Sequence, residues 1–73
     1  MWLIVTTKLP NYSCSYEVVE TREKAEAIVD EAICKELCNL RPNSVTNIYN
    51  TDNSIGIIHE AGDYCFMMQA RRV

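Results

Sequence analysis

The sequence has few of the residues from which active sites and binding loops are usually built. Among its 73 residues there are two Gly, two Pro and one His. It has no glycine-rich phosphate loop, no CxxC or HxxxH spacing for a metal ion, and no glycine-flanked nucleophile. We therefore predict a non-enzymatic protein with no cofactor and no metal site.

Basic residues are scarce as well. Seven Lys and Arg stand against ten Asp and Glu, which gives a net charge of −3 and an isoelectric point near 4.9. Binding of phosphate groups requires clustered Lys and Arg, and the only such pair is Arg71–Arg72 at the C-terminus. The charge balance thus argues against nucleic acid as a partner.

Long hydrophobic runs are also missing. The apolar run at residues 1–5 is too short for a membrane span, which needs about 20 residues, or for the core of a signal peptide. We expect no membrane partner and a cytoplasmic location (host cytoplasm if the chain is phage-encoded). Reduced thiols are then expected at all four cysteines, whereas a secreted protein could pair them in three ways.

The sequence does contain a clear change in the spacing of its apolar residues. Strand-like alternation gives way to helical spacing after residue 20 and returns after residue 44. With 48% apolar and 23% charged residues, the chain has the composition of one globular domain over residues 1–73. We predict an α+β fold of order β-β-α-β-β-β, with one helix packed on one face of an antiparallel sheet. The expected strands cover residues 2–7, 14–20, 45–50, 55–60 and 64–71, and the expected helix covers residues 22–40.

The expected helix has recognisable ends and one apolar face. Thr21 can cap its N-terminus, Glu23 suits the positive end of the helix dipole, and Pro42 disfavours its continuation. Residues at spacings of three and four should face the sheet: Ala25, Ile28, Val29, Ala32, Ile33 and Leu37.

A single helix can cover only one face of a five-stranded sheet. Several strands are nevertheless apolar on both faces, since Trp2 and Ile4 alternate with Leu3 and Val5, and Ile57 precedes Ile58. A second copy of the chain or a partner protein could cover the other face. Alternatively, the twist of a small sheet could bury these residues without help.

Aromatic residues are the first candidates for a binding surface, because Tyr and Trp are favoured as interface anchors. We predict that Trp2, Tyr16, Tyr49 and Tyr64 bind a partner at the sheet face or edge away from the helix. Ordinary core and rim packing is the alternative explanation for them.

The helix offers secondary candidates on its outer side. These are a patch of small residues (Ala27, Cys34 and Cys38) and an acidic stripe that includes Glu23 and Asp30. Each has a simpler explanation as a solvated helix surface. A metal site at the two cysteines would need further ligands from Cys14, Cys65 or His59.

His59, the single histidine, could form a nucleophilic pair with Cys65. No neighbouring motif indicates that either side chain is activated, so a structural or exposed histidine is the better interpretation.

Residues 16–27, YEVVETREKAEA, carry a resemblance. This strand followed by a helix that opens Thr-x-Glu-x-Ala resembles small β-β-α proteins of phages and mobile elements, among them some type I anti-CRISPR proteins. The resemblance implies an inhibitor or modulator that docks on a host protein or complex and has no catalytic residues. The alternatives are a structural or assembly subunit that forms homo-oligomers, a nucleic-acid-binding module, and a thiol or metal protein.

Overall fold

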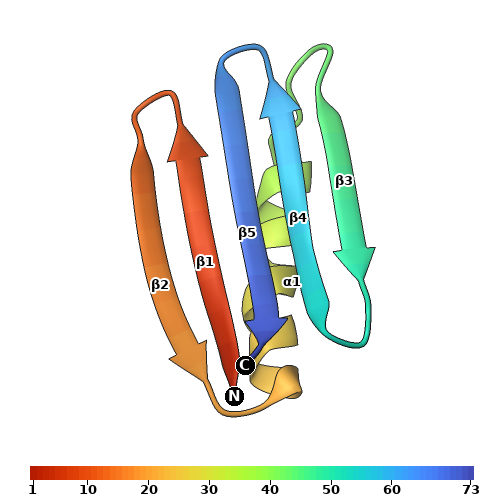
Figure 1. The fold of residues 1–73 in the computed structure, drawn as a ribbon. Coiled ribbons are helices and arrows are strands. Elements are labelled where there is room, and N and C mark those ends of the chain that lie inside the picture. The colour runs from red at the N-terminus through yellow and green to blue at the C-terminus, as the bar shows by residue number, and fades with distance from the viewer.

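Five strands form one antiparallel sheet, and a single helix lies across one of its faces (Figure 1). The computed structural model describes all 73 residues. It confirms the predicted α+β class and the predicted order of elements. The elements are β1 (Trp2–Leu9), β2 (Ser13–Val19), α1 (Arg22–Cys38), β3 (Val45–Asn50), β4 (Ser54–Ala61) and β5 (Tyr64–Arg72).

The strands lie in the order β2-β1-β5-β4-β3, so the first and last strands of the chain are neighbours in the middle of the sheet. The other neighbours are joined by short hairpins, which favour antiparallel pairing. The β4–β5 turn has only two residues between the paired Ala61 and Tyr64. Gly62 takes a φ of 60° there, a conformation that glycine adopts without a steric penalty.

The helix begins where the sequence predicts. Thr21 is its N-cap and accepts a hydrogen bond from the backbone N–H of Lys24. The helix ends at Cys38 rather than at residue 40, because Asn39 adopts a non-helical conformation and caps the last turn through the carbonyl of Lys35. Leu37, which was expected to face the sheet, is exposed.

The core lies entirely between the helix and the sheet. It consists of nine buried apolar residues: Trp2, Ile4, Ala25, Val29, Ala32, Ile55, Ile57, Phe66 and Ala70. Three of them are the helix alanines and valine, whose small side chains let the helix approach the strands closely. Only 11 of the 73 residues are buried, so most of the apolar side chains remain at least partly accessible.

Arg22 fastens the start of the helix to the β3–β4 turn. Its guanidinium donates to the backbone carbonyls of Thr51 and Asp52 and to the side chain of Asn50, and it pairs with Glu26 at 2.7 Å. The same guanidinium lies 5.2 Å from the centre of the Trp2 ring. This contact seals the end of the core where β1 begins.

The single helix has 17 residues and is neither long enough nor apolar enough to cross a membrane.

Candidate functional site

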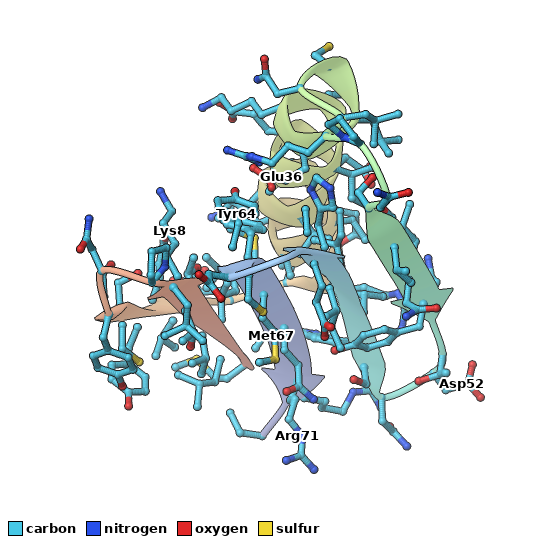
Figure 2. All side chains as sticks on the ribbon, turned by 90° about the horizontal axis from the view of Figure 1, so that it is seen from above. Lys8, Glu36, Asp52, Tyr64, Met67 and Arg71 are labelled. Carbon is cyan, nitrogen blue, oxygen red and sulfur yellow. The ribbon has the colours of Figure 1, made fainter.

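One face of the sheet has no layer over it. Alternation along each strand places half of the strand residues on this face, and in Figure 2 Met67 and Arg71 point away from the helix. We call it the open face. Its apolar and thiol-bearing residues are Leu3, Val5, Leu9, Cys14, Tyr16, Val18, Val45, Tyr49, Ile58, Cys65 and Met67.

The apolar side chains of the open face are well exposed towards the outer strands. Tyr16 and Val18 on β2 are 70% and 54% exposed, and Val45 on β3 is exposed as well. Leu3, Val5, Ile58 and Met67, on the three inner strands, are half-buried by their neighbours. The register places Leu3 beside Val18 and Val5 beside Tyr16, which makes one apolar area on β1 and β2. It places Met67 beside Ile58, which makes a second apolar area on β5 and β4. Between the two areas, Arg71, Gln69 and Thr7 are the register partners of Leu3, Val5 and Met67. Contiguous exposed apolar surface of this kind marks sites of protein association.

Charge is nearly absent from the open face. The chain has ten acidic and seven basic residues, and only one of each lies on a strand with its side chain on the open face: Glu60 on β4 and Arg71 on β5. They lie at opposite ends of the face, since Glu60 is opposite Cys65 in the register and Arg71 is opposite Ser54. Neither forms an ion pair within the chain. The open face is therefore electrically neutral, with one unpaired charge of each sign, and its other side chains are apolar, thiol-bearing or uncharged polar groups (Thr7, Asn47, Ser54 and Gln69).

Tyr49 lies flat on the sheet because its cross-strand neighbour is a glycine. A Cβ at Gly56 would lie 2.6 Å from the Tyr49 hydroxyl oxygen, closer than two such atoms can approach. The absent side chain therefore makes room for the aromatic ring, which extends the apolar surface of the open face across β4.

A small hydroxyl–thiol cluster lies near the β1–β2 hairpin. Thr7 donates a weak hydrogen bond to the Cys14 sulfur at 3.9 Å. Hydrogen bonds from Tyr16 and Tyr12 hold the pKa of the Cys14 thiol below its ordinary value, and their interaction with Cys14 raises the pKa of both phenols. These neighbours therefore stabilise the thiolate of Cys14.

The helix side of the sheet contains a buried polar cluster. His59 is fully buried, and its Nδ1 lies 3.0 Å from Glu36 Oε1, the atom to which the Tyr64 hydroxyl donates at 2.7 Å (Figure 2). Arg41 stacks on the Tyr64 ring at 3.7 Å. Burial, followed by the hydrogen bond to Glu36, raises the pKa of Tyr64. This cluster ties the C-terminal half of the helix to β4 and β5.

The structure separates His59 from Cys65. His59 points towards the helix, whereas Cys65 follows the opposite alternation on β5 and lies on the open face beside Glu60. Burial and the neighbouring carboxylate raise the pKa of Cys65, which disfavours its thiolate. The two side chains therefore do not form a nucleophilic pair, and His59 has the structural role that the sequence favours.

A cavity of about 300 Å³ opens between the helix and strands β1 and β5. Its apolar floor includes Phe66 and Met68, and its wall carries two lysines and two glutamates, Lys8, Lys35, Glu31 and Glu36. Three of these four already have partners, since Lys35 pairs with Glu31 at 3.1 Å and Glu36 accepts a hydrogen bond from Tyr64. The mixed charge does not select a class of ligand.

The four aromatic candidates do not lie together. Tyr16 and Tyr49 are on the open face, as predicted. Trp2 and Tyr64 are on the helix side, where Trp2 is only 3% exposed and Tyr64 bonds to the helix. The prediction that they lie on the surface away from the helix is wrong for these two. They are large side chains that the helix itself covers, so they belong to the core and its rim.

The helix candidates lie on the outer surface, remote from the open face. Ala27, Cys34, Cys38, Glu23 and Asp30 are all exposed. All four cysteines of the chain are free thiols, and no group of three or more His, Cys, Asp or Glu side chains is arranged to hold a metal ion.

Several residues of the open face were not among the candidates that the sequence suggested. Leu3, Val5 and Ile58 were recognised only as side chains on the faces opposite their neighbours. The sequence feature that could have identified them is the presence of apolar residues on both faces of the same strand. The sequence did not indicate Glu60 and Arg71 as candidates. They are distinguished only by the absence of other charged side chains on the same face of the folded sheet.

Comparisons of the chain with protein-family models, with curated proteins and with solved structures find no match.

Proposed function

We propose that this chain is a non-enzymatic protein-binding module that docks on another protein through the open face and thereby alters the activity or assembly of that protein. The observation that carries the proposal is the uneven distribution of charge. Fifteen of the chain's charged residues lie off this face, while the face itself carries exposed or half-buried apolar side chains on every strand and, apart from Glu60 and Arg71, only uncharged polar groups. The desolvation of such a surface favours association by the hydrophobic effect.

The polar clusters of the molecule favour binding over catalysis. The His59 side chain is fully buried between the helix and the sheet, so its imidazole has no open side for a substrate, whereas Glu36 and Tyr64 are partly accessible. Cys14, whose pKa is lowered, has three hydroxyl neighbours and no histidine to serve as its base. A role as a nucleic-acid-binding module is disfavoured by the open face, which carries a single basic residue.

A matched pair of variants tests this proposal. Val18→Asp places a charge on the open face at a site that is 54% exposed, and Leu40→Asp makes the equivalent change beyond the helix at a site that is 59% exposed. Tagged wild type and both variants are used to capture proteins from a lysate of the organism that encodes the chain. Circular dichroism melts establish that all three remain folded.

The proposal expects at least one protein to be captured in fixed ratio by wild type and by Leu40→Asp but not by Val18→Asp. Second copies of the chain count as a captured protein and are recognised by a different tag. Equal capture by both variants, or loss with Leu40→Asp alone, would contradict the open face as the working surface and would direct attention to the helix.

A further inference from the structure

We propose that a second copy of this chain occupies the open face. The two sheets pack face to face about a two-fold axis that runs across the strands, and Arg71 of each copy pairs with Glu60 of the other. This inference rests on the proposed function, because it names the partner of the same surface. It makes a four-layer dimer, with a helix on each outer side and two sheets in the middle.

The position of the two charges indicates the symmetry. On β5, Arg71 lies six residues beyond Cys65, which is the register partner of Glu60. A two-fold axis across the strands reverses the strand direction of the second copy and keeps the lateral order of its strands. It therefore brings Arg71 of one copy over Cys65 on β5 of the other, next to Glu60 on the adjacent strand β4.

A two-fold axis parallel to the strands would place Glu60 and Arg71 unfavourably. A two-fold axis parallel to the strands would keep the strand direction and place each end of the face against the same end of the other copy. With β5 over β5, Arg71 would then face Arg71, and Glu60 would lie over the Leu9 end of β1 with no opposite charge beside it. Like charges that are brought together in an interface oppose association strongly. The transverse axis forms two complementary pairs, and every other strand residue at the interface is uncharged.

The neutrality of the face favours a second copy over a charged partner. The whole chain carries a charge of −3, but this face carries one positive and one negative charge. A strongly basic or acidic protein would gain no attraction here, whereas an identical face supplies matching charges at both ends. A two-fold interface uses the same patch twice, so it must be complementary to itself, and this one is.

The area is adequate for a stable contact. Five strands at a spacing of about 4.8 Å and eight residues of about 3.3 Å each define a plane of roughly 600 Å² before the relief of the side chains is counted. Standard interfaces bury about 800 Å² on each partner. Aligned packing of two sheets about 10 Å apart then places apolar side chains of both copies in a second core.

Pairing of sheet edges is the main rival arrangement, because β2 and β3 are both unpaired on their outer sides. The two arrangements predict different roles for the charges. Glu60 and Arg71 lie on β4 and β5, which are inner strands, so edge pairing would not bring them together. A charge-exchange experiment therefore separates the two.

Sedimentation equilibrium is measured from about 1 to 100 μM, a range that covers micromolar dimers. The samples are wild type, Glu60→Arg, Arg71→Glu and the double variant Glu60→Arg/Arg71→Glu. Both residues are exposed and unpaired within the chain, so the fold should tolerate each change. Circular dichroism melts check this directly.

We expect wild type to dimerise in this range, each single reversal to weaken the dimer about tenfold or more, and the double exchange to restore it to within about threefold. A wild type that stays monomeric throughout overturns the inference. So does a dimer whose double variant is no better than the single variants. A monomer that still captures another protein in a Val18-dependent manner would leave the proposed function intact. A chain that neither dimerises nor captures a protein would contradict both the dimer and the proposed function.

Discussion

The two faces of this sheet are built from the same alternation of side chains but have different surroundings. On the helix side, Ile4, Ile57 and Phe66 are buried beneath α1, and the one polar group among them, His59, is hydrogen-bonded to the helix. On the open side, Leu3, Ile58 and Met67 have similar chemistry and no covering layer. The comparison teaches that alternation of apolar residues along a strand does not by itself show which face of the sheet the chain covers with its own helix.

The largest expected difference between the two faces is in the stability lost when either of two neighbouring isoleucines on β4 is truncated. Ile57 is 0% exposed beneath the helix, and Ile58 points to the open face. Ile57→Ala should lower the free energy of unfolding by about 2–5 kcal/mol, because it leaves a cavity in the core. In dilute solution, Ile58→Ala should cost much less. Urea unfolding of the two variants measures the difference, and equal losses would mean that the two faces are not distinct.

The buried polar cluster provides the next test. Glu36→Leu removes the acceptor shared by His59 and Tyr64, and each group left without a partner costs about 1–3 kcal/mol. Glu36→Gln, which keeps an acceptor oxygen, is the control and should lose less. Thermal and urea unfolding give the values. If the leucine variant is as stable as wild type, the cluster does not hold the helix to the sheet.

Gly56 tests the packing of the open face itself. Gly56→Ala drives a methyl group into the Tyr49 ring and towards the carbonyl of Met68. Overpacking of this kind costs about 1–3 kcal/mol. Adding Tyr49→Ala should recover part of the loss, since it removes only one of the two obstacles. Unfolding of the single and double variants decides, and a fully tolerated Gly56→Ala would show that the ring does not lie on the sheet.

The smallest effect concerns the reactivity of the thiols. The pKa of Cys14 is lowered and that of Cys65 is raised, so as pH increases Cys14 should become a thiolate first. Alkylation by iodoacetamide, followed by mass spectrometry across pH, should label Cys14 at lower pH than Cys65. Replacing Tyr12 and Tyr16 by Phe should move the Cys14 profile to higher pH, whereas an unchanged profile would mean that the phenols do not stabilise the thiolate.

Local patterns predicted the elements well because each has a local cause. Thr21 caps the helix, Gly62 permits the tight turn, and alternation marks the strands within a few residues of their ends. The antiparallel class follows from the short connections. The placement of β1 beside β5 has no such cause, because it joins the two ends of the chain.

The candidate site was less predictable, since it depends on which face the helix covers. Trp2 and Leu3 are both large and apolar, and nothing local indicates that Trp2 faces the helix. The bond between Glu36 and His59 spans 23 residues and follows only from the packing of the helix. The isolation of Glu60 and Arg71 as the two charges of the open face likewise emerges only when five strands are placed side by side.

Two neighbouring methionines on β5 allow the most direct test of the central claim, that the open face is the surface through which this chain associates. Met67 points to the open face (Figure 2), Met68 packs against the core on the helix side, and both are half-buried. Pulsed oxidation with mass-spectrometric readout can follow each sulfur as the protein concentration rises or a captured partner is added. The account predicts that Met67 becomes protected on association while Met68 is unchanged. Association that leaves Met67 as reactive as before would contradict it.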